Sequence, residues 1–422
     1  MKIKIKEMAF EDVLSLPINK REKPVRQNSL LKILVSILSF FELMKAKFKY
    51  TCNGMERLKK KEPCIILMNH SSFLDLKIAF KIFKKRKFNI ISTEDTFVGK
   101  KWLMKHLGCV STLKFLTDTM LVRDMMYIVN KLKCSVLMYP EACYSFDGTA
   151  STMPEKSLGK CLKLLKVPLV VVQTKGAFAY DPLYNGLQIR NVNVSADVTY
   201  VLSKEEIEEK SVDEINEIIM KYFSFDNFKW QQENKIKISE PFRADGLNRI
   251  LYKCPHCMEE SFMVGKGTTI KCENCNHEYE LTEYGYLRCL TGDAKFTHIP
   301  DWFKWERECV KQEIKEDKYL LDTNVDIYML VDSKCLYKVG EGRLTHNKDN
   351  GLTLIGCNGK LKYNQKASSL YTLNSDFFWY EIGDVIGIGD QTARYYCFPK
   401  NKKDVVCKAR LAQEEIYKIY NK

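Results

Sequence analysis

The stretch that decides the fold is Ile65–Asp75, IILMNHSSFLD. A short apolar run ends at Asn69 and His70, two serines follow, and Asp75 comes five residues after the histidine. A run of this length that is bounded by Pro63 and by polar residues is typical of a buried strand. A helical pattern follows, so the stretch predicts a strand-to-helix connection that contains His70.

Two other runs have the same character. They are CSVLMYPE, residues 134–141, and VPLVVV, residues 167–172, and patterns typical of helices separate the three runs. Strands that alternate with helices predict an α/β domain, which we assign to residues 51–245. Near its end, Ser203 and Ser211 are each followed three positions later by a glutamate, which predicts two capped helices.

His70 and Asp75 have two interpretations. A general base needs an imidazole and a carboxylate that holds its other ring nitrogen, and Asp75 could supply that carboxylate. Alternatively, Ser72 and Asp75 fit a capping box, and His70 is simply hydrogen-bonded at the end of a strand. The position favours chemistry, because α/β sheets bind ligands at the carboxyl ends of their strands and Glu141 ends the second run.

Three blocks of the sequence resemble the glycerolipid acyltransferases, the 1-acylglycerol-3-phosphate acyltransferase group. NHSSFLD, residues 69–75, resembles their Asn-His-x-Ser-x-x-Asp block, and YPEACYS, residues 139–145, resembles Phe-Pro-Glu-Gly-Thr-Arg-Ser. VPLVVV resembles Val-Pro-(Ile/Val)-Val-Pro-Val. The blocks occur in the family's order and the resemblance covers about residues 30–225. It implies an acyltransferase that works on the cytoplasmic face of a membrane.

The resemblance also implies roles for single residues. His70 would deprotonate an acceptor hydroxyl, which then attacks an acyl thioester carried by CoA or by acyl carrier protein, and Asp75 would orient His70. Asn69, Ser72 and Glu141 would lie on the substrate-binding side. The implied acceptor is a lysophospholipid, by default 1-acylglycerol-3-phosphate, which would yield phosphatidic acid.

The sequence departs from the family at the residues that would hold the acceptor phosphate. Gly-Thr-Arg of the family's Phe-Pro-Glu-Gly-Thr-Arg-Ser block reads Ala142-Cys143-Tyr144 here, so Tyr144 stands where the family has arginine. A further family block, Gly-x-Ile-Phe-Ile-x-Arg, is poorly kept and aligns with Gly108–Lys114, which puts Lys114 at its arginine, and Arg123 is an alternative that needs a shifted alignment. Lysine binds phosphate without the bidentate fork of arginine. A different hydroxylated lipid therefore remains an alternative acceptor.

Residues 246–290 predict a zinc ribbon. Two Cys-x2-Cys pairs at the spacing of structural, tetrahedral Zn²⁺ sites are formed by Cys254, Cys257, Cys272 and Cys275. Four thiolates complete such a site, so His256 and His277 are not expected to be ligands. The ribbon lacks a dense basic patch, and nucleic acid is therefore not an expected partner.

Residues 1–50 form a basic segment: residues 1–61 contain 15 Lys and Arg against 6 Asp and Glu. Residues 29–50 predict a helix capped by Ser29. This helix either lies in the membrane interface, with its lysines at the headgroups, or packs against the next domain. No apolar run is long enough to span a bilayer, and the first residues do not resemble a signal peptide. We therefore expect a protein in the reducing cytosol, bound peripherally to the inner face of the cell membrane, whose sixteen cysteines do not form disulfides.

Residues 319–422 predict a third, β-rich unit that ends in a helix. A small barrel of the pleckstrin-homology-like kind is one architecture that fits this order, by analogy of fold only. The rival to an enzyme is a lipid-sensing or regulatory scaffold without catalysis, which would use the ribbon and this unit to bind a partner. The intact His70 and Asp75 favour the enzyme, and Tyr144 favours a changed function.

Overall fold

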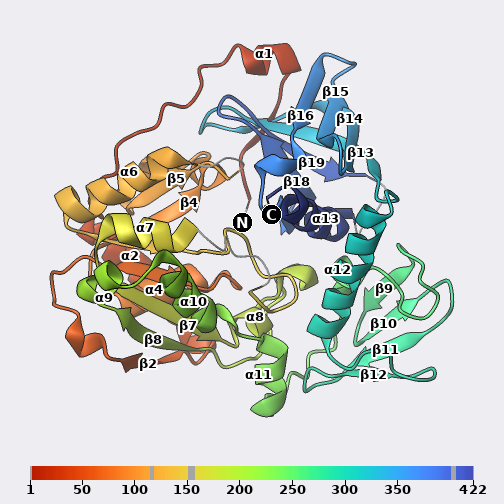
Figure 1. Ribbon diagram of the computed structural model, residues 1–422, viewed down its shortest axis with the longest axis horizontal. Coiled ribbons are helices and arrows are strands. Elements are labelled where there is room, and N and C mark those ends of the chain that lie inside the picture. Colours follow the sequence, from red (N-terminus) through yellow and green to blue (C-terminus); the bar gives the residue numbers. More distant parts are fainter. Residues whose placement is uncertain (1, 115–117, 151–156, 401–404, 422) are drawn as a thin grey trace.

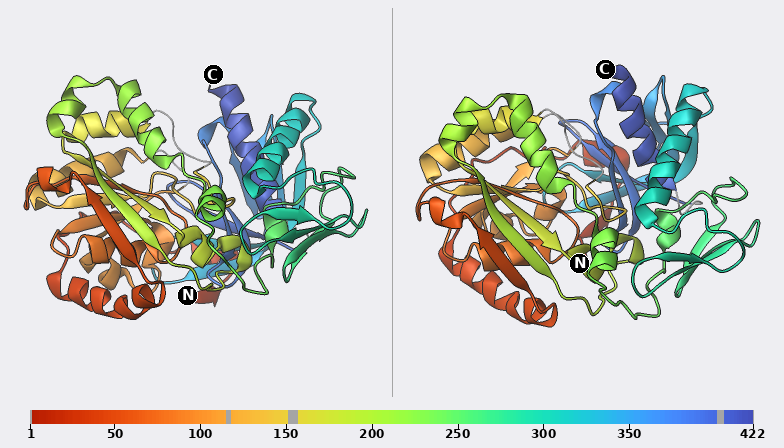
Figure 2. Two further views of the ribbon diagram at one scale, coloured as in Figure 1. Left: turned by 90° about the horizontal axis from the view of Figure 1, so that it is seen from below. Right: turned by 60° about the horizontal axis from the view of Figure 1, so that its bottom comes forward.

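The computed structural model describes residues 2–114, 118–150, 157–400 and 405–421 (Figure 1). Within these ranges the strands form three sheets, with seven, four and eight strands. The seven-stranded sheet and the four-stranded sheet lie at opposite ends of the molecule in both views of Figure 2.

The seven-stranded sheet confirms the predicted α/β domain. Its order is β2 (Lys49–Asn53), β8 (Ser195–Leu202), β7 (Leu169–Lys175), β3 (Ile65–Met68), β6 (Ser135–Met138), β4 (Phe88–Thr93) and β5 (Cys109–Thr112). Neighbours are parallel except β7 and β8. The three apolar runs are the adjacent central strands β7, β3 and β6, so they are buried on both sides.

Helices cover both faces of this sheet. Ile66 and Met68 pack into one core with α4 (Asp75–Ile82), whereas Ile65 and Leu67 pack into another with α6, α7 and α10. Burial on alternate sides explains why the strand reads as an unbroken apolar run. The other helices of this domain are α5 (Lys101–His106), α6 (Thr119–Tyr127), α7 (Ser157–Leu165), α8 (Ala177–Tyr180), α9 (Lys204–Glu209), α10 (Val212–Phe223) and α11 (Asn227–Glu233). The predicted capping boxes at the starts of α9 and α10 are confirmed.

The N-terminal helix differs from the prediction. It is two helices, α2 (Ser29–Leu38) and α3 (Phe40–Lys45), and Asn28 rather than the predicted serine caps the first of them. The hydroxyl of Ser39 donates to the carbonyl of Val35 at 2.7 Å. A serine that bonds back to the preceding turn bends a helix, which fits a break at this residue. Lys49, which was predicted to lie at the end of this helix, begins strand β2 instead.

The residues before α2 join the far end of the chain, which the sequence analysis did not anticipate. Strand β1 (Ile5–Glu7) pairs in parallel with β14 (Leu336–Asn347), and α1 (Phe10–Leu14) follows it. The chain then crosses to the seven-stranded sheet. Residues close to the N-terminus and the last third of the sequence therefore share one sheet.

The ribbon is an antiparallel sheet in the order β12 (Leu287–Cys289), β11 (Glu278–Leu281), β10 (Thr269–Cys272) and β9 (Met263–Lys266). A long helix, α12 (Ile299–Lys315), follows it. The fully buried Trp302 of α12 belongs to the same core as ribbon residues and C-terminal strand residues. The ribbon, α12 and the C-terminal sheet are thus packed as one body.

The β-rich C-terminal region is confirmed. Its sheet has the order β16 (Leu361–Gln365), β15 (Gly351–Gly356), β14, β13 (Leu321–Leu330), β19 (Arg394–Pro399), β18 (Gly383–Gly389) and β17 (Asn374–Trp379), with β1 added at β14. Apart from β1, all of its neighbours are antiparallel. The last helix, α13 (Val405–Tyr420), packs against α12 and β17. A pleckstrin-homology-like architecture stays a prediction.

Candidate active site

The parallel pairing of β3 with β6 brings the first two sequence blocks together. Ile65 is in register with Val136, so the residues that follow the two strands emerge at the same edge of the sheet. There the backbone amide of His70 donates to Glu141 Oε2 at 2.8 Å. Residues 71 positions apart in the sequence therefore meet directly, at the edge where α/β sheets bind ligands.

His70 and Asp75 form a hydrogen-bonded pair, with 3.0 Å between Nδ1 and Asp75 Oδ2. Asp75 is the first residue of α4 and is buried. Its Oδ2 also accepts from the backbone amides of Ser71 at 2.8 Å and Ser72 at 3.1 Å. The carboxylate thus reaches back over the helix start and holds the imidazole with the same oxygen. Only half of the predicted capping box is present, because Asp75 accepts from the Ser72 amide but Leu74, not Ser72, is the cap residue of α4.

This pairing determines which nitrogen of the imidazole can act as a base. With Nδ1 protonated and donating to Asp75, Nε2 carries the lone pair of a general base. The ring of His70 is stacked between Tyr139 and Tyr144, with centroid separations of 4.1 and 3.9 Å, and Phe73 stacks on the outer face of Tyr144. Aromatic faces restrict rotation of the ring and attract its cationic form.

Asn69 and Ser72 contact backbone groups beside this pair. Asn69 Oδ1 accepts from the amide of Thr174 at 2.7 Å and from its hydroxyl at 3.0 Å, which ties the end of β3 to β7. Ser72 Oγ accepts from the amide of Leu74 at 2.9 Å, within the turn that enters α4. Both side chains shape the loop on either side of His70.

Lys114 lies in the turn after β5, close enough to affect two buried groups near the site. Burial raises the pKa of Cys143 to about 11, and the nearby charges of Arg410 and Lys114 oppose that shift. Burial likewise raises the pKa of Asp376 to about 7, again opposed by Lys114. Arg123 is exposed on α6, where it donates to the sulfur of Met120 on the same helix. Of the two cations considered for the acceptor, Lys114 is the one near the Cys143 loop.

Three further residues near His70, namely Tyr139, Asp181 and Arg410, were not predicted from the sequence. Tyr139 directly precedes Pro-Glu, and Asp181 follows the third apolar run, but neither residue type at those positions is a recognisable signal by itself. Asp181 Oδ2 accepts from the amide of Phe73 at 3.3 Å. Its pKa is raised to about 8 by burial, a shift that a hydrogen bond from Ser72 opposes and the Asp75 carboxylate increases.

Glu141 is also buried, and burial raises its pKa to about 8 despite the hydrogen bond from the His70 amide. In the unfolded chain its pKa is 4.5, so between about pH 4.5 and 8 the unfolded chain loses this proton while the folded chain keeps it. The folded state then binds more protons, and this group makes the free energy of unfolding fall as pH rises, by up to about 1.4 kcal/mol per pH unit.

Replacing Glu141 by glutamine is therefore expected to make this pH dependence shallower, because glutamine does not titrate and its oxygen can still accept from the His70 amide. Urea unfolding of both proteins at several values between about pH 5 and 8 measures the difference in slope. The exposed Glu205→Gln should leave the slope as in the wild type across this window, since its pKa lies below its ordinary value. Equal slopes for wild type and Glu141→Gln would contradict a buried neutral carboxyl.

A small pocket lies beside this cluster. Its polar lining includes the side chains or backbone of Asn69, Ser71, Glu141, Ser145, Gln173 and Asn227, and Phe223 and Phe225 add apolar surface. One wall consists of residues from the loop between β6 and α7. The position of that loop therefore determines the shape of the pocket.

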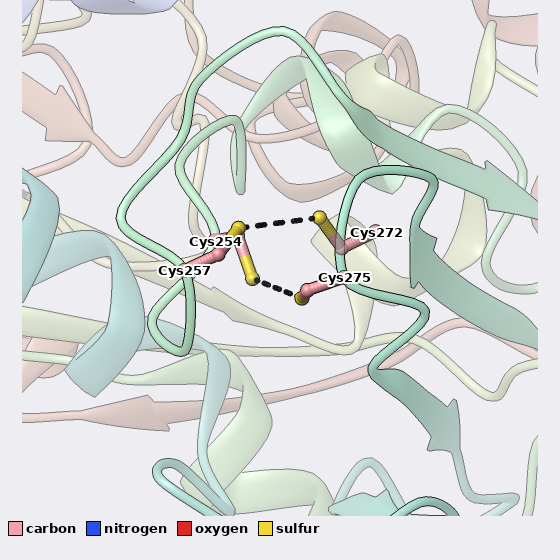
Figure 3. Close-up of side chains that lie close together, drawn as sticks. All are labelled: Cys254, Cys257, Cys272 and Cys275. Carbon is pink, nitrogen blue, oxygen red and sulfur yellow. Dashed lines mark hydrogen bonds between the residues drawn. The ribbon is translucent and has the colours of Figure 1, made fainter.

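The four predicted cysteines converge at the base of the ribbon (Figure 3). Their sulfur atoms all lie within 4.8 Å of one another, with 3.6 Å between those of Cys254 and Cys275 and 3.7 Å between those of Cys257 and Cys272. Tetrahedral zinc with bonds of about 2.3 Å separates its sulfurs by about 3.8 Å. The thiolates therefore fit a structural Zn²⁺ ion, which these four side chains would hold.

The chain is similar to known proteins in two respects. Residues 49–175 match the family model described as Acyltransferase. The chain is also similar to the crystal structure of the 1-acyl-sn-glycerophosphate (LPA) acyltransferase PlsC from Thermotoga maritima, at 16% sequence identity and a TM-score of 0.36, over 46% of this chain and 76% of that chain. The matched range of the family model includes strands β2–β7 and both residues of the His70–Asp75 pair. The similarity to the acyltransferase family is therefore carried by residues 49–175, which are 127 of the 422 residues.

Proposed function

We propose that the protein transfers a fatty acyl group from an acyl thioester, acyl-CoA or acyl carrier protein, to the hydroxyl of a lysophospholipid. The observation that carries this proposal is the orientation of His70 within an acyltransferase domain. Its Nδ1 is 3.0 Å from a buried carboxylate oxygen, which leaves Nε2 to act as a base.

In this reaction His70 Nε2 takes the proton of the acceptor hydroxyl as the oxygen attacks the thioester carbonyl. The tetrahedral intermediate collapses, the carbon–sulfur bond breaks, and the leaving thiolate takes up the proton from the imidazolium. Asp75 offsets the positive charge on His70 between these steps. The stacked rings of Tyr139 and Tyr144 favour the same cationic form.

The proposed acceptor is 1-acylglycerol-3-phosphate, and a different hydroxylated lipid is the alternative. Lys114 could contact a phosphate as a point charge, but Tyr144 offers no cation. Asn69 and Glu141 line the pocket beside the His70 loop, whereas Ser72 is buried and accepts from the Leu74 amide. Radiolabelled acyl transfer, measured with a panel of phosphorylated and neutral acceptors, tests the reaction and identifies the acceptor together.

A non-catalytic scaffold is the second candidate, and the tyrosine at position 144 is the observation in its favour. Such a protein would bind lipid at the same site and would use the ribbon and the C-terminal sheet to engage a partner. Absence of acyl transfer across the whole panel, with lipid binding retained, would support the scaffold. Transfer that depends on His70 would exclude it.

We also propose that the protein binds the inner face of the cell membrane through α2 and α3. Eight large apolar side chains of these helices are exposed: Leu30, Ile33, Leu34, Ile37, Leu38, Phe40, Phe41 and Met44. Exposed lysines follow α3 directly. Apolar burial combined with cations at the headgroups is the pattern of an interfacial helix. Among the described residues, no helix has the length and apolar character needed to cross a bilayer.

The position of this surface suits a lipid enzyme. Glu42 of α3 forms an ion pair with Lys77 of α4, the helix that begins at Asp75. The apolar face is thus next to the helix that carries half of the catalytic pair. A lipid acceptor would reach the site without leaving the bilayer surface.

Replacing both Phe40 and Phe41 by serine is expected to weaken binding to anionic vesicles by at least about 100-fold, because the two buried aromatic rings together contribute roughly 3–6 kcal/mol. Sedimentation with vesicles of phosphatidylcholine and phosphatidylglycerol measures the change. The matched control replaces Leu320 and Ile355 by serine. These side chains are exposed to a similar degree but lie outside α2 and α3, so this variant should bind as the wild type does. Undiminished binding of the phenylalanine variant, or equal loss in both variants, would contradict the proposal.

A further inference from the structure

The loop between β6 and α7 controls the surroundings of His70. Of its residues up to 150, Tyr139 and Tyr144 stack on the imidazole, and Glu141 accepts from the His70 amide. The amide of Ser145 donates to the His70 carbonyl at 3.0 Å. A shift of this loop would therefore disturb His70 on both ring faces and at its backbone.

One residue of this loop has an unfavourable backbone conformation. Ala142 has a φ of +55°, in the left-handed region that side chains with a β-carbon rarely adopt. Such residues persist only where the surrounding structure over-determines them. The loop therefore needs contacts from outside to keep Tyr144 against His70.

Those contacts come from the C-terminal unit. Arg410 of α13 lies with Nη2 2.9 Å from Cys143 Sγ and Nη1 3.4 Å from the carbonyl oxygen of Tyr144. Its guanidinium carbon lies 4.2 Å from the ring centroid of Phe146, and Phe377 of β17 stacks on that ring at 4.3 Å.

These contacts are buried. Arg410 is 3% exposed, Phe146 1% and Phe377 0%. The guanidinium is further oriented by an ion pair with Glu414, one turn along α13, and Glu414 also pairs with Arg307 of α12. The hydrogen bonds and ring contact of this buried arginine are directed at the loop and at Glu414. It acts on the loop.

We propose that the C-terminal unit is part of the catalytic unit, with Arg410 as a positioning residue that holds the loop of residues 139–150 against His70. Only a planar guanidinium can stack on Phe146 and donate to Cys143 and Tyr144 together, so lysine cannot replace it. The C-terminal unit would therefore determine how well the dyad works. The catalytic part of this inference rests on the proposed function, and the structural part does not.

Hydrogen exchange tests the structural part without an activity assay. Arg410→Lys keeps the charge that Glu414 needs but loses the fork, and the amides of residues 141–149 are expected to exchange about 10-fold faster than in the wild type. The matched control is Arg394→Lys, because this buried arginine of β19 bonds to Asp390 and pairs with Glu94 rather than with residues 139–150. Its loop amides should exchange at the wild-type rate. If Arg410→Lys does not fold, Phe377→Leu removes the stacking on Phe146 and should have the same local effect.

Kinetics test the catalytic part. Arg410→Lys is expected to lower kcat by about 10-fold, because the loop orients the base for the chemical step. KM for the acyl donor should stay within about two-fold, because the substitution is not expected to change donor binding. Wild-type exchange in the loop of a folded variant would overturn the proposal, as would faster exchange with an unchanged kcat. If the wild type transfers no acyl group at all, the proposed function fails, and loop exchange in Arg410→Lys still decides whether Arg410 holds the loop.

Discussion

His70→Ala is expected to lower kcat for acyl transfer by about 10³-fold, because positioned general bases contribute roughly 10²–10⁴-fold. The substitution removes the nitrogen that accepts the hydroxyl proton. The neighbouring groups cannot replace it: Glu141 and Asp181 have their pKa values raised to about 8 by burial and are mostly protonated at neutral pH. Radiolabelled transfer to the acceptor that the wild type uses, at saturating acyl donor, measures the loss.

Asp75→Asn separates orientation from proton transfer. The asparagine oxygen can still accept from the amides of Ser71 and Ser72, so the turn into α4 should persist, but the charge that balances the imidazolium is lost. We expect kcat to fall by about 10²-fold. His106→Ala is the matched control, since this histidine lies on α5 and bonds to Trp102 of its own helix. Wild-type activity in a folded His70→Ala protein would contradict the mechanism.

Loss of zinc is expected to have the largest effect on stability. We expect about one zinc ion per chain, because four thiolates at this separation form a closed structural site. Structural zinc contributes roughly 10–16 kcal/mol of apparent binding free energy at neutral pH. Cys254 and Cys272 belong to the same core as Trp302 of α12 and the C-terminal strands, so the loss should extend beyond the ribbon. A net loss of about 5 kcal/mol would lower Tm by roughly 6 °C if the 422 residues unfold as one unit.

Cys272→Ser tests this expectation by elemental analysis together with calorimetry. Both the zinc content and Tm should fall. Cys289→Ser is the matched control, because this cysteine lies in the ribbon strand β12 but outside the cluster of four sulfurs. A wild-type protein that is folded and free of metal would contradict the zinc assignment. So would an unchanged Tm in Cys272→Ser.

Helix α13 connects the zinc site to the active-site loop. The helix packs on α12, whose Glu306 accepts from the amide of Lys253, the residue just before the first cysteine. Helix α13 also carries Arg410, which contacts the active-site loop. Zinc loss is therefore expected to reduce acyl transfer as well, through displacement of α13. The ribbon then acts as a support for the active site at a distance.

Several features were predictable from the sequence because they depend on neighbours along the chain. His70 and Asp75 are five residues apart, so a strand end followed by a helix start is enough to bring them together. The paired cysteines follow the same logic, since each Cys-x2-Cys turn presents two thiols at once. Ser203 and Ser211 cap helices through residues three positions away.

Local patterns were less reliable at the N-terminus. The apolar pattern of residues 29–50 predicted one helix, but Ser39 bonds back to the preceding turn and divides it. Asn28 and the following serine are both good capping residues, and the chain used the first. Neighbouring residues of similar propensity compete within about one kcal/mol, and packing decides between them.

By itself, the sequence predicted a histidine held by a carboxylate at the end of a buried strand and four cysteines at zinc spacing, and the structure brings both sets of side chains together. Only the tertiary structure decided what surrounds them. It placed β1 beside β14, Asp181 near Phe73, and Arg410 against a loop that lies more than 260 positions earlier. Contacts within one turn leave a periodic mark in the sequence. A contact between distant segments depends on how whole layers pack, and no spacing along the chain records it.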